Sequence, residues 1–470
     1  MKSIPLIILI ASCQVAFSQS HNDGEINFTS SDSVLENGFK WARLQAMRYV
    51  RRGNDPVGHW YEAALPEREA FCMRDVAHQL SGANLLGLSD INKNLLAHFV
   101  KSISASRDWC GYWEIDKFNR PAPVDYRSDD DFWYNLPGNF DILNACFRQY
   151  QWTGDTTFLY DKAFVNFYSR TCNDYVNRWD TDSDGIMEGT RSVEKHDRGI
   201  GSYDESLTGI TGNDLIAAQF IGYSSYSAIL RVTGNELDAG FYIDRSKKLR
   251  DEFDKRWWDG ENQSYHHFLT KDGWLHNDVM QLFLLRWDFI PSNRIQPVLK
   301  SILVQEGKLN VEMRSYFARE MFRYGDAAEA RRLLKSTIDP TLERREYPEV
   351  SFGALEAYAE GLMGIDVRMD SHSVRTLSRV KSDENAKLEN IPLVDGTFSI
   401  EHHGQHESIF VNNTSREILW WACVTGKAKR MFINGKSAKT QELLDAGQRI
   451  VTYAVVKIPR GKSCRVKVMP

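Results

Sequence analysis

The sequence predicts a mainly α-helical protein: a toroid of helical hairpins of the (α/α)6 type over residues 30–367, followed by a small β-sandwich-like domain over residues 385–470. Three observations predict this fold class. Apolar residues recur at helical spacing through most of the chain, glycines separate several of these segments, and short strand-like segments replace them towards the C-terminus.

The helical domain is predicted from apolar residues at positions i, i+3, i+4 and i+7, which share one face of a helix. The pattern is present in segments 34–50, 70–88, 140–152, 158–179, 215–232, 313–324 and 353–363. About 340 residues accommodate six hairpins of roughly 55 residues each, a size that allows a closed double ring of helices.

Several predicted helices end at a glycine, namely Gly87, Gly154, Gly234 and Gly325. Glycine adopts the left-handed conformation that ends many helices. The Asp or Asn that directly follows three of these glycines can cap the next helix. This repeated pattern predicts helical hairpins.

The character of the chain changes after Ile365. Residues 366–390 are polar and without periodicity, which predicts a linker. The segments that follow are rich in β-branched and aromatic residues and are separated by turn residues such as Asn434-Gly435. The strands are expected at 397–402, 408–411, 418–421, 430–433 and 451–455. We expect this β domain to support the helical domain.

The composition limits the classes of partner. The chain carries 13 Trp, 19 Tyr and 24 Phe. This aromatic content suits a site that stacks on sugar rings, and it suits a large helical core equally well. The formal net charge of -5 and the absence of long basic runs argue against a nucleic acid as the main partner.

The N-terminus has the features of a signal peptide. Lys2 precedes the apolar run Ile4–Ala11, and Ala16–Ser18 offers a small-residue cleavage site, so residues 1–18 are predicted to be removed on export. Alternatively, Ile10–Cys13 resembles a lipobox, in which Cys13 becomes lipidated. Either way we expect an exported protein, periplasmic or tethered to the outer membrane, with no later segment apolar enough to span a bilayer.

The sequence predicts no metal centre or cofactor. The six cysteines after Cys13 are scattered without a C-x-x-C pair, and we expect most to be buried thiols, although export permits a disulfide such as Cys423 with Cys464. Asp180, Asp182 and Asp184 alternate like the start of a calcium loop. The twelfth position of that loop is Arg191, where an EF-hand needs Glu, so calcium in another geometry remains the alternative.

Acidic residues at helix ends are candidates for catalysis, because a ring of helices can hold two carboxylates across a cleft. One carboxylic acid can protonate a glycosidic oxygen while a carboxylate activates water, the two lying about 6.5–9.5 Å apart in an inverting enzyme. Glu346 is the leading candidate for the base. It precedes a proline and follows Arg345, which favours the ionised form of its carboxylate; a surface Glu–Arg pair is the alternative.

Two further segments could bind and protonate a sugar. Arg74 and Asp75 can grip vicinal hydroxyls, or they form a salt bridge at a helix start. Asp204 and Glu205 lie in a glycine-rich loop without an evident structural task and are candidate general acids, whereas Asp214 is expected to cap the following helix.

The acidic and aromatic segment 129–135 is a candidate sugar platform. Asp131, Trp133 and Tyr134 would contribute to it, and Trp113 would line the same pocket. A solvated acidic loop that caps the next helix is the alternative.

Together these segments resemble the six-hairpin glycosidase superfamily, which includes trehalases, processing α-glucosidases and glucoamylases. The similarity lies in the Arg-Asp motif of 72–75, the Asp-x-Asp-Gly turn of 182–186 followed by Glu188, the loop 203–206, and the Glu-Tyr-Pro segment of 346–348. The resemblance implies sugar binding by Arg74, Asp75, Glu188, Arg345 and Tyr347. The loop 203–206 departs from the acid-loop signature of the trehalases and processing glucosidases. The tryptophan-rich signatures of trehalases are also missing, so trehalose is not the expected substrate.

The resemblance therefore implies a secreted, exo-acting and inverting glycoside hydrolase that removes a terminal sugar. One alternative is a glycosidase specific for a uronic acid, because arginines could form a carboxylate clamp. Two others are a polysaccharide lyase on a related toroid and a non-catalytic periplasmic carbohydrate-binding protein. The clamp residues would be Arg74, Arg191, Arg198, Arg344 and Arg345.

Overall fold

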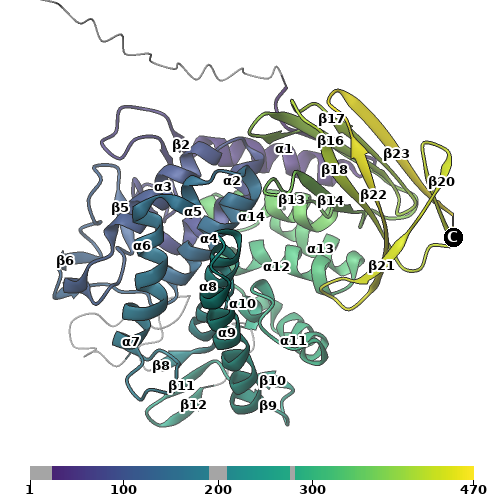
Figure 1. Ribbon diagram of the computed structural model, residues 1–470. Coiled ribbons are helices and arrows are strands. Elements are labelled where there is room, and N and C mark those ends of the chain that lie inside the picture. Colours follow the sequence, from purple (N-terminus) through teal and green to yellow (C-terminus); the bar gives the residue numbers. More distant parts are fainter. Residues whose placement is uncertain (1–23, 190–208, 276–280, 470) are drawn as a thin grey trace, which may run out of the picture.

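The computed structural model describes residues 24–189, 209–275 and 281–469. It contains a helical region and a strand-rich C-terminal region that lie side by side (Figure 1). The prediction of a helical toroid accompanied by a β domain is confirmed at this level.

The helical region consists of helices connected by loops of very different lengths. Its helices are α1 (Ser33–Arg48), α2 (Met73–Leu85), α3 (Ser89–Ser102), α4 (Gly138–Thr153), α5 (Thr157–Tyr160), α6 (Lys162–Arg170), α7 (Val176–Trp179), α8 (Asn213–Val232), α9 (Glu236–Trp257), α10 (Leu282–Arg286), α11 (Ser292–Val304), α12 (Val311–Tyr324), α13 (Ala327–Thr337) and α14 (Pro348–Glu356). A π-helical turn, Ala357–Leu362, continues α14.

Six of these helices form a closed inner ring. In the described residues α2 packs on α4, α4 on α8, α8 on α10, α10 on α12, α12 on α14, and α14 returns to α2. Outer helices cover them, among them α1 on α14, α9 on α8 and α13 on α12. The sequence reflects the two environments, because α2 is buried at nearly every position whereas α9 buries one narrow stripe from Ala239 to Trp257.

The two ends of the ring differ in their connections. Long loops, 49–72, 103–137 and 258–281, precede inner helices, so they gather at the N-terminal ends of these helices. Short turns follow the inner helices. Gly154 and Gly234 have φ of 71° and 87°, as their predicted role at helix ends requires. Gly325 instead has an extended backbone, so its position does not depend on the left-handed conformation.

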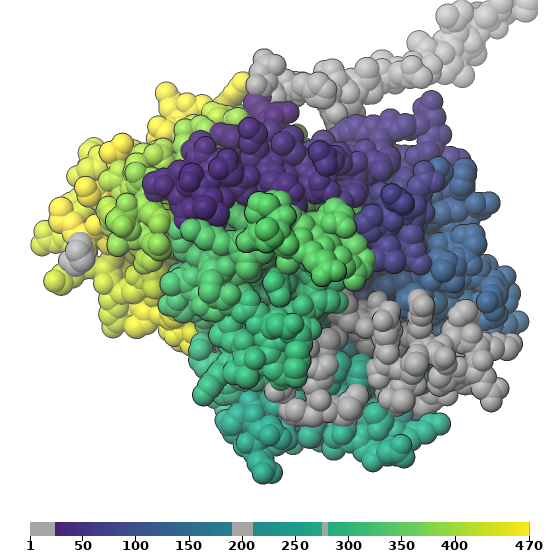
Figure 2. Space-filling view, turned by 180° about the vertical axis from the view of Figure 1, so that it is seen from behind, coloured from purple at the N-terminus to yellow at the C-terminus, as the bar shows by residue number. Residues whose placement is uncertain are grey.

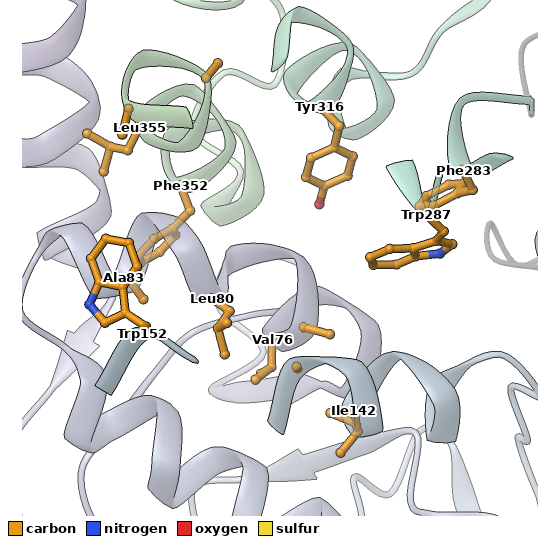
Figure 3. Packing of buried hydrophobic residues seen from close by; sticks show 14 of the residues in the cluster. Val76, Leu80, Ala83, Ile142, Trp152, Phe283, Trp287, Tyr316, Phe352 and Leu355 are labelled. Atoms are coloured by element: carbon orange, nitrogen blue, oxygen red, sulfur yellow. The ribbon is translucent and has the colours of Figure 1, made fainter. Parts of the chain in front are cut away.

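The helical core lies inside the ring. Figure 3 shows Val76 and Leu80 of α2 facing Phe283 and Trp287 of the α10 segment and Tyr316 of α12. These side chains from three inner helices belong to one cluster of buried hydrophobic residues.

The strand-rich region is built from two sheets. Their orders are β1-β15-β16-β17-β23-β19-β20 and β13-β14-β18-β22-β21. Phe410 stacks on Phe398 of its own sheet at 5.2 Å and on Trp420 of the other at 5.4 Å, so aromatic packing joins the sheets. The strands are β1 (Asn27–Ser30), β13 (Asp366–Arg368), β14 (Ser373–Leu377), β15 (Asn385–Leu393), β16 (Gly396–His403), β17 (Glu407–Asn412), β18 (Ile418–Thr425), β19 (Arg430–Ile433), β20 (Lys436–Ala438), β21 (Gln441–Leu444), β22 (Ile450–Ile458) and β23 (Lys462–Met469).

The predicted linker 366–390 is wrong, because it contains β13, β14 and the start of β15. β14 pairs in parallel with β18, a partner far along the chain that local sequence does not reveal. The N-terminal strand β1 pairs with β15 in the other sheet. Figure 2 shows the resulting contact between the N-terminal segment, in purple, and the strand region.

The six cysteines of the described residues are buried free thiols, as expected for most of them. No helix in the described part of the chain is both long and apolar enough to cross a membrane.

Candidate active site

The N-terminal ends of the inner helices bring together an arginine and two carboxylates. Arg74 Nε lies 2.7 Å from Asp141 Oδ2, and Arg74 Nη1 lies 3.2 Å from Asp214 Oδ2. All three side chains are at most 2% exposed. Burial raises the pKa of Asp141 to about 6, against the opposing effect of Arg74. Arg74 therefore joins α2, α4 and α8 at the ring axis.

Asp214 does not cap α8, contrary to the prediction. The N-cap is Gly212, and Asp214 lies in the first turn, where its carboxylate reaches Arg74. A polar residue before an apolar run is typical of an N-cap, which is why Asp214 was expected to cap the helix. Its position is instead determined by the ion pair with Arg74, a residue far away in the sequence.

An aromatic layer lies directly beneath this charged group. The Arg74 guanidinium lies 5.2 Å from the ring centre of Phe283, and His78, one turn further along α2, stacks on the same ring at 5.4 Å. His78 also meets the ring of Tyr316 at 5.1 Å. Burial, together with the nearby Arg286 and Arg74, holds the pKa of His78 well below its usual range, so this imidazole is neutral.

Glu349 is the carboxylate of the Glu-Tyr-Pro-Glu segment that points into the ring. It is 7% exposed, lies in the first turn of α14, and accepts a hydrogen bond from the hydroxyl of Tyr316. A carboxylate is stabilised at this position by the helix dipole. Glu349 was not among the candidates from the sequence. A signal was available, because Pro348 is typical of a helix start and the residue after it then lies in the first turn.

Glu346 is exposed in the turn before α14. Its backbone carbonyl accepts a hydrogen bond from Gln45 Nε2 at 3.5 Å. Its predicted role as the base stays a prediction, because nothing in the geometry assigns a role to its side chain.

The arginines around Glu346 are stacked on aromatic rings. Arg345 lies 3.6 Å from the ring centre of Trp41, and Arg344 lies 4.1 Å from that of Tyr347. Tyr347 is itself buried in a small apolar cluster. Arg74 is engaged by two carboxylates, and Arg191 and Arg198 lie outside the described residues, so the clamp for a uronic acid stays a prediction.

The aromatic residues of the predicted sugar platform are buried and pack against other rings. Trp113 and Trp133 lie 5.3 Å apart at an interplanar angle of 30° and are 6% and 5% exposed. The carbonyl of Trp113 accepts a hydrogen bond from the backbone N–H of Met73, at the start of α2. Tyr134 packs on Trp179.

Two of the predicted sugar-binding acids are more accessible. Asp131 and Asp75 are partly exposed, Asp131 beside Arg127 and Asp75 in the first turn of α2. They can therefore reach a ligand without rearrangement of the core.

A buried carboxyl pair, Glu114 and Asp125, adjoins the start of α2 because Cys72 is paired with Glu114 in a two-stranded ladder. Burial, followed by the hydrogen bond to Asp125, raises the pKa of Glu114 to about 9. Arg68 Nη1 lies 2.9 Å from Glu114 Oε2. No motif signalled this pair, because Glu114 lies in a three-residue strand and Asp125 in the turn that follows.

The acidic turn forms a compact cluster of carboxylates. Asp180, Asp182, Asp184 and Glu188 have oxygen atoms that all lie within 4.8 Å of one another, a ligand type that Ca²⁺ prefers. Glu188 accepts hydrogen bonds from the N–H and hydroxyl of Thr181, and burial raises its pKa to about 7. These bonds make a closed turn whether or not a cation binds, so calcium stays an alternative.

The candidate acids Asp204 and Glu205 lie outside the described residues. The segments on either side meet, since the N–H of Gly189 donates to the carbonyl of Ile210 at 2.7 Å. The second of these segments leads directly into α8 and Asp214.

No family model matches the chain, and no curated protein matches its sequence. Solved structures do share its fold. An α-L-rhamnosidase from Dictyoglumus thermophilum has a TM-score of 0.59 at 12% identity, covering 95% of this chain and 50% of that one. A GH78 family rhamnosidase of Bacillus sp. GL1 has a TM-score of 0.56 at 13% identity, covering 82% and 40%.

A Streptomyces avermitilis α-L-rhamnosidase, solved with L-rhamnose, has a TM-score of 0.53 at 12% identity, covering 95% of this chain and 42% of that one. The chain thus spans half the length or less of these three structures. At such low identity the likeness concerns the fold. The chain therefore shares the fold of these rhamnosidases.

Proposed function

We propose that this chain is an exported glycoside hydrolase with an (α/α)6 barrel, which removes a terminal sugar from an oligo- or polysaccharide with inversion of configuration. One observation carries the proposal. The end of the ring that bears the long loops holds the buried carboxyls Asp141, Asp214 and Glu349 within a fold that known glycosidases share. Long loops on a rigid scaffold are a common location of enzyme active sites.

Glu349 is the strongest candidate for the carboxylate that activates water. The Tyr316 hydroxyl fixes its orientation, and the N-terminus of α14 favours its ionised form. Asp204 or Glu205 would protonate the leaving oxygen. Glu346 remains the alternative base and would act from the rim of the same helix start.

Substrate binding would use the side chains around the start of α2. Asp75 and Asp131 would accept hydrogen bonds from sugar hydroxyls, as carboxylates do at many sugar sites. Trp113, Trp133 and Tyr134 would form the apolar wall. Arg74 would act by positioning Asp141 and Asp214, since its guanidinium already contacts both.

The test is a screen of the purified protein against plant, algal and host glycans, with released monosaccharides identified. Glu349→Gln removes the charge and preserves the shape of the side chain. Glu346→Gln tests the alternative, and Glu343→Gln, at an exposed position of the same segment, is the matched control. Loss of hydrolysis only in Glu349→Gln supports the proposal. Retention of anomeric configuration, seen by proton NMR, would exclude the inverting mechanism.

A lyase is the second candidate, because the site also contains groups that a lyase uses. Tyr316 and His78 lie in ring contact beside Arg74, and lyases pair a Tyr or His base with an arginine. Such an enzyme would produce an unsaturated uronate with a characteristic ultraviolet absorbance. A binding protein would instead retain a glycan without turnover.

Export would be tested on the mature protein. N-terminal sequencing after expression with the full leader should show cleavage after Ser18. If Cys13 carries lipid, Cys13→Ser will move the protein from the membrane fraction to the soluble periplasmic fraction.

A further inference from the structure

A cavity of about 430 Å³ lies at the opposite end of the ring. Residues of α2, α4, α8, α10 and α12 and of the π-helical turn after α14 line it, and β13, β14 and the turn before β22 line the other side. We call it the C-terminal cavity. Figure 1 shows β13 and β14 between the helices and the outer strands, which is where the cavity wall changes from helix to sheet. Asp366 and Arg368, both exposed, form its rim.

The lining of the C-terminal cavity is rich in arginine. Seven arginines and four carboxylates line it among the described residues, and each of these carboxylates is already paired. The buried Glu320 and Glu356, behind the lining, are engaged by Arg286, Arg319, Arg323 and Arg148. The pairs of the lining carboxylates are Asp288 with Arg323 at 2.9 Å, Glu360 with Arg319 at 2.7 Å, Asp366 with Arg368 at 3.2 Å and Asp445 with Arg449 at 2.8 Å.

Arg375 and Arg379, both in the sheet-side wall, make no ion pair with the described residues. Arg379 Nη1 donates to the carbonyl of Gly361 at 2.6 Å. Burial, and then the repulsion of nearby arginines, lowers the pKa of Arg379 to about 9. This wall of the cavity therefore carries positive charge that the surrounding carboxylates do not neutralise.

Hydrogen-bond donors are also in excess here. Arg286 Nε, Trp287 Nε1 and Arg379 Nε are buried without an acceptor among the described residues, and the first two side chains are 3% and 4% exposed. A buried donor without an acceptor is costly. The carbonyls at the helix C-termini explain why arginines collect at this end. These carbonyls do not explain why Arg375 and Arg379 lack a carboxylate partner among the described residues.

We propose that the C-terminal cavity binds a small anionic sugar, one carrying a carboxylate, phosphate or sulfate group. Arg375 and Arg379 would hold the anionic group, since guanidinium forks suit planar or tetrahedral oxyanions. Trp152 and Phe147, which line the helical side, would contact the sugar ring. The volume is in the range of ordinary small-molecule sites, roughly 300–1,000 Å³.

This proposal is independent of the proposed hydrolysis, because the cavity lies at the other end of the ring. A ligand bound there would touch both the inner helices and the strand region. It would therefore raise the resistance of the whole chain to unfolding.

The test is calorimetric titration of the full chain with glucuronate, glucose 6-phosphate, inorganic sulfate and neutral glucose. We expect the anionic sugars to bind and glucose not to bind. Arg375→Gln should weaken binding at least about tenfold, the effect of losing one charge-assisted hydrogen bond. Arg430→Gln, at an exposed position of β19, is the matched control and should bind like the wild type.

Arg379→Lys keeps the charge and shortens the fork, so it tests Arg379 even if Arg379→Gln fails to fold. Equal affinity in Arg375→Gln and the control would overturn the proposal, as would equal affinity for sulfate and the sugars. Binding that is lost in Glu349→Gln but kept in Arg375→Gln would place the ligand at the candidate active site. That outcome refutes the C-terminal cavity and leaves the proposed hydrolysis standing.

Discussion

The two ends of the helical ring use the same architecture for opposite charges. At the N-terminal ends of the inner helices, one arginine holds the buried carboxylates Asp141 and Asp214. At the C-terminal ends, the described residues surround a few carboxylates with many arginines. The helix dipoles favour this distribution, because helix N-termini attract anions and C-termini attract cations.

The ends also differ in what covers them. Long loops reach the N-terminal end, whereas short turns and the strand region cover the C-terminal end. Loops at the N-terminal end can vary with the substrate. The C-terminal end is instead fixed by its packing against the strand region. This difference is why we assign catalysis to the N-terminal end and ligand-linked stabilisation to the C-terminal end.

The largest expected effect is at the N-terminal end. Glu349→Gln should reduce kcat by roughly 100- to 10,000-fold, the usual contribution of a general acid or base. Glu346→Gln should reduce kcat much less, because its side chain is exposed. Steady-state rates on the substrate found in the screen measure both, and an equal loss in the two variants would remove the distinction we draw between them.

The next effect compares two buried arginines, one at each end. Arg74→Met should cost about 3–5 kcal/mol of unfolding free energy, since it leaves two buried carboxylates. Arg286→Met should cost less, about 1–3 kcal/mol, because Glu356 and Glu320 keep contacts with Arg148 and Arg319. Urea unfolding measures the difference. A larger loss for Arg286→Met would contradict the view that the C-terminal end has cations in excess.

The two ends should also respond to pH in opposite directions. The raised pKa of Glu114 means that the folded state retains a proton which the unfolded state has lost, so stability falls as pH rises from about 4.5 to about 9. Glu114→Gln should flatten this slope in urea midpoints.

At the other end, burial raises the pKa of Glu360, but Arg319 and Arg148 outweigh it and lower the pKa to about 2. Its contribution is present above the unfolded pKa and is lost as pH falls towards about 2. Glu360→Gln should therefore reduce the acid sensitivity below pH about 4.5 and leave the alkaline slope unchanged. If Glu114→Gln and Glu360→Gln changed the pH dependence of stability in the same way, these two pH dependences would be wrongly assigned to Glu114 and Glu360.

The smallest effect is expected on the outer surface. Arg256 pairs with Asp184 at 2.9 Å, but the arginine is half exposed, so Arg256→Gln should change the unfolding free energy by less than about 1 kcal/mol. Thermal unfolding at low and high salt would check this value. A larger loss would indicate that the acidic turn depends on this arginine for its shape.

Patterns in the local sequence were sufficient to predict much of the fold. Five of the inner helices were predicted because apolar periodicity is strong in them, and five C-terminal strands because β-branched and aromatic residues cluster there. The short inner helix α10 was missed, since five residues are too few to show a helical period. The outer helix α9 was missed, since only a narrow stripe of it is buried. β14 was missed because its partner β18 is distant in sequence.

The candidate site was less predictable, because ring closure determines which acids point inwards. Motif similarity selected Glu346, whereas the helix start at Pro348 directs Glu349 towards Tyr316. The contacts of Arg74 with two other helices, and the proximity of Glu114 to Asp125, arise from long-range packing that spacing along the chain does not encode.

The central claim is that the N-terminal end of the ring hydrolyses glycosides. The most direct measurement is the release of monosaccharide from the glycan panel by the wild type, Glu349→Gln and the control Glu343→Gln, with folding verified by thermal unfolding. We predict release by the wild type and the control and almost none by Glu349→Gln. Release by Glu349→Gln at the wild-type rate, or no release from any glycan by the wild type, would contradict the claim.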